Sequence, residues 1–174
     1  SEDLPIREFL ISPTGEVYII LNYLYSYIDR NGNQQQAILL KVNPNDNTYT
    51  NIDNTLSSIN QKVGSNKSIQ FDTLGNIYYF GSSNSNIVLR KSKGGAHTDL
   101  INSNIYVWDW LVLDNGTVFI YGESPSTLTR WFRKINPDNS LINIIGSGVY
   151  INFIKKFPDN KIYFGDWGKL FGVG

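Results

Sequence analysis

Four copies of one short pattern recur along the 174 residues and constrain the fold more than any other feature. In each copy an apolar run leads into a turn, and a second apolar run follows. The turns centre on Gly15, Gly75, Gly116 and Asn160, and Gly and Asn are the residues that most readily adopt positive φ. A β-branched residue and then an aromatic residue follow each turn, two and three positions on: Val17–Tyr18, Ile77–Tyr78, Val118–Phe119 and Ile162–Tyr163. The pattern predicts four β-hairpins closed by short loops.

A second hairpin is expected after each of the first three. Asn43-Pro44 and Asn136-Pro137 each interrupt two strand-like runs, and Gly94-Gly95 occupies the corresponding place between them. The four turn residues lie 60, 41 and 44 positions apart, and a period of about 40–45 residues with four strands is typical of a β-propeller blade. The first interval is longer because residues 21–36 are expected to extend its second hairpin around the Asn31-Gly32 turn.

The predicted fold is therefore all-β, a β-propeller-like array of about three and a half four-stranded antiparallel blades. We expect one domain over residues 1–174, with repeat units at approximately 6–53, 67–101, 106–145 and 150–174. No long segment shows the 3.6-residue periodicity of an amphipathic helix. Closed propellers have four to eight blades, so three alternatives stay open: a fragment of a larger propeller, a ring completed by another copy, or a compact irregular domain.

The segment Asp72 to Tyr78, Asp-x-x-Gly-Asn-Ile-Tyr, resembles the blades of NHL-like and related bacterial β-propellers, and the resemblance extends from about Phe9 to Gly174. The resemblance implies that the first strand of each blade lines a central channel, and that the blade-connecting loops form the ligand face. Some propeller hydrolases, lactonases and lyases hold a divalent cation with acidic residues at the channel mouth. The WD40 and Kelch signatures do not recur.

Composition excludes several classes of protein. The 15 basic and 15 acidic residues cancel, which argues against nucleic acid as a partner. The absence of Cys excludes disulfides and cysteine-ligated zinc, and a single His excludes a multi-histidine metal site. We find no cofactor motif and no apolar run long enough for a transmembrane segment. The low charge and the many Asn and Tyr residues favour a secreted, periplasmic or cell-surface location.

Two aromatic groups are candidates for binding. Tyr23, Tyr25 and Tyr27 alternate along the extended hairpin, so we expect them on one strand face, which a neighbouring blade need not cover. The alternative is that they pack onto Ile28, Ile38 or an adjacent blade. Tyr106 and Trp108 are expected to share a side of the innermost strand with Trp110, while Asp109 points to the other side. Glu123 and Trp167 lie in outer hairpins that are expected to reach the same end of the blades.

The function favoured by the sequence is a non-catalytic binding module that presents aromatic loops to a protein or glycan partner, with no cofactor and no metal site. One alternative is part of a hydrolase or lyase, in which Asp109, Glu123 and Asp166 converge at an acidic, calcium-binding channel mouth. The other is a structural half-propeller that associates with a second copy or with missing blades of a parent chain.

Overall fold

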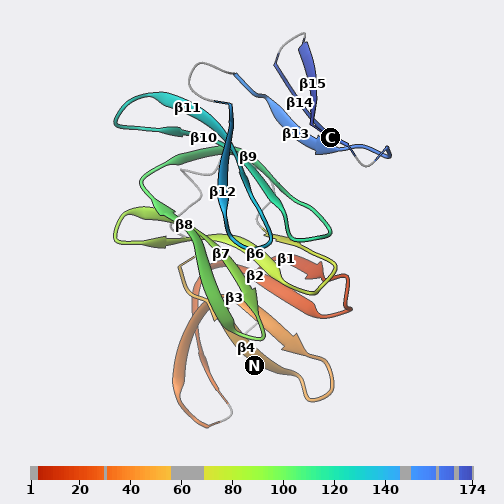
Figure 1. Cartoon of the computed structure of the whole chain (residues 1–174). Coiled ribbons are helices and arrows are strands. Elements are labelled where there is room, and N and C mark those ends of the chain that lie inside the picture. The colour runs from red at the N-terminus through yellow and green to blue at the C-terminus, as the bar shows by residue number, and fades with distance from the viewer. Residues whose placement is uncertain are drawn as a thin grey trace.

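The computed structural model describes residues 4–29, 31–55, 69–145, 150–159, 161–166 and 169–173. These residues form fifteen strands in four separate antiparallel sheets and no helix (Figure 1). In each sheet the strands follow one another in chain order. The prediction of an all-β, propeller-like array is confirmed. The described residues accordingly contain no helix able to cross a membrane.

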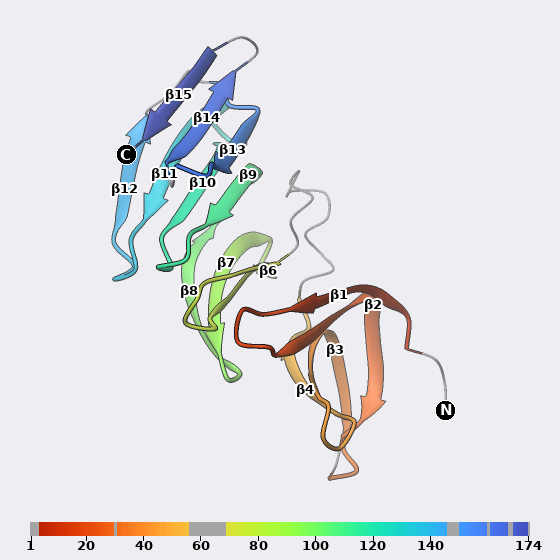
Figure 2. The same cartoon turned by 90° about the vertical axis from the view of Figure 1, so that its right-hand side faces the viewer.

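Each sheet is one blade, and the blades succeed one another along the array in chain order (Figures 1 and 2). Blade 1 contains β1 (Ile6–Ile11), β2 (Val17–Ile28), β3 (Gln34–Asn43) and β4 (Thr48–Asp53). Blade 2 contains β5 (Ile69–Phe71), β6 (Ile77–Ser83), β7 (Asn86–Lys93) and β8 (Ala96–Ser103). Blade 3 contains β9 (Tyr106–Val112), β10 (Val118–Ser124), β11 (Thr129–Ile135) and β12 (Leu141–Ile145). Blade 4 has three strands, β13 (Phe153–Lys156), β14 (Ile162–Asp166) and β15 (Lys169–Val173).

The first hairpins of blades 1, 2 and 3 close through the same turn. Gly15, Gly75 and Gly116 have φ angles of 82°, 78° and 83°. The N–H of each glycine donates to the carbonyl oxygen three residues earlier, at 2.9, 3.3 and 2.9 Å. A residue with a Cβ is strained at such angles, so the recurrence of glycine follows from the backbone. Asn160, the fourth predicted turn residue, lies outside the described residues.

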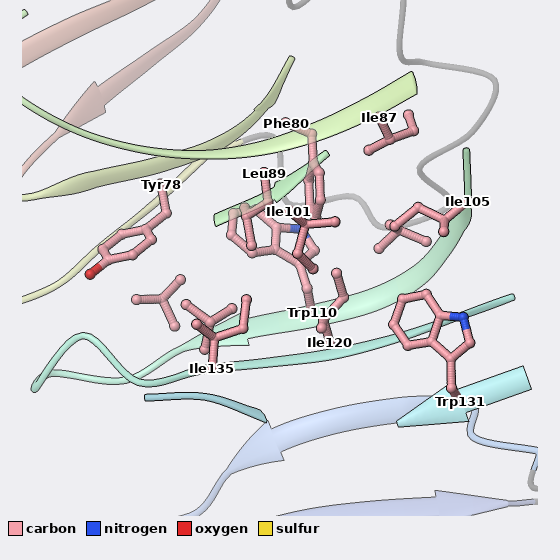
Figure 3. Packing of buried hydrophobic residues seen from close by; sticks show 13 residues of the cluster. Tyr78, Phe80, Ile87, Leu89, Ile101, Ile105, Trp110, Ile120, Trp131 and Ile135 are labelled. Carbon is pink, nitrogen blue, oxygen red and sulfur yellow. The ribbon is translucent and has the colours of Figure 1, made fainter. Parts of the chain in front are cut away.

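The aromatic residue after each turn fills the joint between its own blade and the next. Tyr18, Tyr78 and Phe119 are 2%, 0% and 3% exposed, and each belongs to the apolar cluster that joins the two blades. Figure 3 shows the cluster between blades 2 and 3, where the Phe80 ring meets the Trp110 ring edge-on at 5.0 Å between centroids. Because a middle strand is covered on both faces, its residues form continuous buried runs, as in residues 77–80 of β6.

Polar side chains join the innermost strands of neighbouring blades. The Gln70 side chain of blade 2 donates to the Trp110 carbonyl oxygen of blade 3 at 3.1 Å and accepts from the Val112 N–H at 2.9 Å. Between blades 3 and 4, the Asp109 carboxylate accepts from the Ile154 N–H at 2.8 Å. Inter-strand hydrogen bonds stop at the edge of a sheet, so these side chains continue the connection from blade to blade.

Candidate functional site

A β-bulge in β9 determines which aromatic side chains reach the surface of blade 3. Tyr121 of β10 pairs with Asp109, but the next residue, Gly122, pairs with Val107, so Trp108 is the extra residue. The bulge reverses the alternation of faces. Trp108 is 47% exposed and Tyr106 is also exposed, whereas Trp110 is fully buried in the same cluster as Val107. The prediction that Tyr106, Trp108 and Trp110 share one side is therefore wrong for Trp110.

Glu123 lies near the end of β10 and pairs across the hairpin with Arg130 of β11. The Arg130 Nε and the Glu123 Oε2 are 2.9 Å apart. This hydrogen bond from the guanidinium to the carboxylate raises the pKa of Arg130 above its ordinary value. The pair fixes a planar cation at the end of blade 3 where β9 begins.

Arg130 lies close to two aromatic side chains. Its guanidinium carbon is 4.0 Å from the centroid of the Tyr150 ring and 6.0 Å from the centroid of the Trp108 ring. Tyr150 precedes β13 of blade 4 and is 58% exposed. Both distances allow a cation–π interaction. The arrangement holds the two rings at the surface with part of each ring open to solvent.

These side chains line a groove of about 260 Å³ where blade 3 meets the chain that leads into blade 4. We call it the blade 3–4 groove; its lining residues are Trp108, Tyr121, Arg130, Tyr150, Ile151 and Asn152. One of the predicted residues, Trp108, lines the groove. A second, Glu123, does not line it but is bonded to Arg130, which does. Sequence reasoning missed Arg130, Tyr150 and Asn152. The alternation of β10 and β11 around their turn offered one signal, because it could have placed Arg130 opposite Glu123.

Asp109 does not line this groove. Its carboxylate accepts hydrogen bonds from the Ile154 N–H and from the Trp110 N–H, both at 2.8 Å. No three His, Asp or Glu side chains among the described residues lie close enough together to hold a metal ion. Trp167 and the side chain of Asp166 lie outside the described residues. Of the three acids expected to converge, the structure describes the side chains of Asp109 and Glu123 only. These two bond to different partners, Ile154 and Arg130.

The three tyrosines of the extended hairpin are separated in the structure. Between the pairs Ile20–Leu39 and Tyr25–Ala37 the register of β2 shifts relative to β3. Tyr23 is 58% exposed, while Tyr25 and Tyr27 are half-buried against the blade 1 cluster. Burial raises the pKa of Tyr27 above its ordinary value. The expectation of three tyrosines on one uncovered face is therefore wrong for Tyr25 and Tyr27.

A larger hollow of about 410 Å³ lies beside blade 1 and includes Gly94 of blade 2. Its two charged residues, Glu16 and Lys41, pair with each other. None of the residues that line it is aromatic. The blade 3–4 groove is therefore the stronger candidate, because it alone of these two hollows combines exposed rings with fixed polar groups.

Likeness to known proteins is found among solved structures. No protein-family model matches the sequence, and no curated protein matches it. Among solved structures, the chain is similar to a protein named provisionally as a gluconolactonase, with a TM-score of 0.48 and 11% sequence identity. The likeness covers 95% of this chain and 57% of the other, so the chain spans little more than half the length of that protein.

Proposed function

We propose that the chain is a glycan-binding module and that its ligand occupies the blade 3–4 groove. The observation that carries the proposal is the placement of Trp108 and Tyr150, two exposed rings that both lie within cation–π distance of Arg130. Aromatic rings are large, rigid surfaces that bind the apolar face of a sugar ring at low cost in conformational entropy. The proposal refines the broader expectation of a protein or glycan partner.

The polar groups around the rings suit the hydroxyl groups of a sugar. Asn152 carries both a hydrogen-bond donor and an acceptor, and Arg130, held by Glu123, offers planar donors at a fixed place. A groove of about 260 Å³ is slightly smaller than typical drug-sized pockets of about 300–1,000 Å³. We therefore expect it to hold one or two sugar rings of a longer glycan.

The hydrolase or lyase alternative needs acidic residues that converge on a cation. Asp109 and Glu123 instead bond to Ile154 and Arg130, so these two acids favour the binding module. The Tyr23 region remains a further expected contact for a partner, but its two neighbours in the row are half-buried.

Replacement of Trp108 by Ala tests the proposal. Binding would be measured by calorimetry against short oligosaccharides of glucose, mannose, xylose and galacturonic acid. For the tightest of these we expect the variant to lose at least about tenfold in affinity, which corresponds to about 1.4 kcal/mol. Tyr49→Ala is the matched control, because Tyr49 is also an exposed ring, lies on blade 1 outside the groove, and should leave the affinity unchanged. Equal affinity of the Trp108→Ala protein and the unaltered protein would contradict the proposal.

A further inference from the structure

The charged side chain that lines the blade 3–4 groove is a cation. Arg130 contributes its guanidinium, while the other lining residues have aromatic, aliphatic or amide side chains. Among the described residues, no acidic side chain lines the groove. The Asp109 carboxylate of the same blade is occupied elsewhere, by the N–H groups of Trp110 and Ile154. The first charged group that a ligand in the groove meets is therefore positive.

Glu123 pairs with this cation through one nitrogen only. Its carboxylate accepts from the Nε of Arg130 at 2.9 Å, and Nε carries one of the five N–H donors of a guanidinium. The Glu123 side chain is 12% exposed and does not line the groove, whereas the Arg130 side chain is 28% exposed and does. In the described part of the chain, the two terminal nitrogens of Arg130 form no ion pair. The guanidinium thus keeps donors for a second anion.

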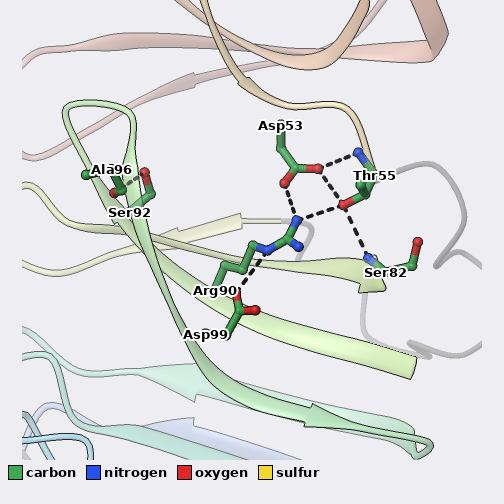
Figure 4. A network of polar contacts seen from close by, with 7 residues as sticks. All are labelled: Asp53, Thr55, Ser82, Arg90, Ser92, Ala96 and Asp99. Atoms are coloured by element: carbon green, nitrogen blue, oxygen red, sulfur yellow. Dashed lines mark hydrogen bonds and ion pairs between the residues drawn. The ribbon is translucent and has the colours of Figure 1, made fainter. Parts of the chain in front are cut away.

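Another arginine shows that a guanidinium of this fold can bind two carboxylates at once. Arg90 bonds through Nε to Asp99, its partner on the facing strand of the same blade, at 3.1 Å (Figure 4). Its Nη1 bonds at 2.6 Å to a second carboxylate, Asp53, which blade 1 supplies. Arg130 has the first kind of partner, because Glu123 faces it across its own hairpin. Among the described residues it lacks the second, so one more carboxylate has a place beside it.

The rings beside Arg130 indicate what kind of molecule carries that carboxylate. The centroids of the Tyr150 and Trp108 rings lie 4.0 and 6.0 Å from the guanidinium carbon, and both rings are exposed. In a uronic acid the carboxylate is attached directly to the sugar ring, so one sugar offers both an apolar ring face and an anion. A carboxylate is planar and has two oxygens, which suits the planar donors of a guanidinium.

We propose that the blade 3–4 groove selects acidic glycans, and that the carboxylate of a uronic acid binds Arg130 as Asp53 binds Arg90. The inference rests on the proposed function, because it names the class of glycan that the same groove binds. Trp108 and Tyr150 contact the sugar ring, and Arg130 distinguishes an acidic sugar from a neutral one. The preference arises because hydrogen bonds between ionised partners are about twice as strong as those between neutral ones.

A comparison of one sugar with and without its charge tests the preference on the unaltered chain. Calorimetry would measure the binding of trisaccharides of galacturonic, glucuronic and mannuronic acid, each beside its methyl ester, which keeps the sugar ring and removes the charge. We expect the tightest of the acids to bind at least about tenfold more tightly than its ester. High salt should weaken the binding of the acid but not of the ester, because salt screens the charged contact.

The outcomes separate this inference from the proposed function. An acid that binds no more tightly than its ester would overturn the preference for acidic glycans and leave a glycan site in place. The absence of binding by every acid, ester and neutral oligosaccharide would overturn the proposed function as well.

Variants test whether Arg130 is the group that recognises the charge. Arg130→Gln combined with Glu123→Gln replaces the ion pair with two amides, so no carboxylate is left without its partner. We expect this double variant to bind acid and ester equally, a loss of about tenfold in preference, while it keeps its affinity for the ester. Arg133→Gln is the matched control, because Arg133 lies on the same strand, donates to Asn143 and does not line the groove. An unchanged preference in a folded double variant, or an equal loss in Arg133→Gln, would overturn the inference.

Discussion

The joint between blades 1 and 2 and the joint between blades 2 and 3 use the same strand positions for different chemistry. Arg90 of β7 pairs with Tyr79 across its hairpin, and Arg133 of β11 occupies the equivalent place opposite Ile120. Arg90 donates to the Asp53 carboxylate of blade 1 at 2.6 Å and to Asp99 at 3.1 Å (Figure 4). Arg133 instead donates to the Asn143 side chain at 3.0 Å. Both joints bury an apolar cluster, and the first adds a charged network. We call the joint between blades 1 and 2 the charged joint and the joint between blades 2 and 3 the aromatic joint.

The two arginines also differ in the direction in which their surroundings shift the pKa. Burial disfavours the charged form of Arg90, but the Asp53 and Asp99 carboxylates outweigh it and raise its pKa. Burial lowers the pKa of Arg133, which has no acidic partner among the described residues and stacks on Trp131 at 4.3 Å. The first joint therefore adds a completed ion-pair network to its apolar cluster, whereas the second has apolar contact around Trp110 and no such network among the described residues.

Trp110→Ala should have the largest effect, because it empties the centre of the aromatic joint. Removal of a buried Trp side chain costs about 3–5 kcal/mol of unfolding free energy. Denaturant titration measures this loss, with Trp108→Ala as the control on the same strand. An equal loss for the exposed Trp108 would contradict the assignment of opposite faces by the bulge.

Asp53→Ala should have the next largest effect, because it leaves a buried guanidinium without its closest carboxylate. We expect a loss of about 3 kcal/mol. The double variant Asp53→Leu with Arg90→Met should recover most of it, because no buried charge is left without a partner and the Asp99 carboxylate is exposed to water. Arg133→Met is the control in the aromatic joint and should cost about 1 kcal/mol. A double variant less stable than Asp53→Ala would contradict the claim that charge pairing stabilises this joint.

Acid should weaken blade 1 slightly through Glu16. Glu16 lies at the edge of blade 1, and its hydrogen bond from Lys41 holds its pKa below the ordinary value of 4.5. A carboxyl group whose pKa falls on folding contributes stability above that ordinary value, and the contribution is lost as pH falls through the lowered pKa. The melting temperature should therefore fall less between pH 7 and pH 3 for Glu16→Gln than for the unaltered chain. The effect is small, about 0–1 kcal/mol, because the pair is partly exposed; an equal fall would contradict it.

Much of the fold could be predicted from the sequence because the turns carry their own chemistry. Gly75 and Gly116 mark where the backbone takes positive φ, and the aromatic residue three positions later marks the joint. Both signals are local, so four copies of the pattern suffice to predict blades. The shift in the β2–β3 register could not be predicted, because extra residues in one strand leave no mark in the alternation of a tyrosine row.

The candidate site was less predictable because it depends on contacts between distant segments. Trp108 and Glu123 were identified as an aromatic residue and an acid near one end of the blades. Their roles follow from Arg130, which pairs across a hairpin, and from Tyr150, which enters from the next blade. The bulge that exposes Trp108 and buries Trp110 could not be predicted either, because the prediction assumed that side chains alternate between the two faces of the strand without interruption.

The most direct test of the blade 3–4 groove as a glycan site is a titration of the ¹⁵N-labelled chain with the same oligosaccharides, followed through the indole N–H resonances of its tryptophans. Trp108 is half exposed in the groove, while Trp110 and Trp131 are buried elsewhere in blade 3. The account predicts that the Trp108 resonance shifts in a saturable way and that those of Trp110 and Trp131 stay in place. Saturable binding that leaves the Trp108 resonance unmoved would contradict it.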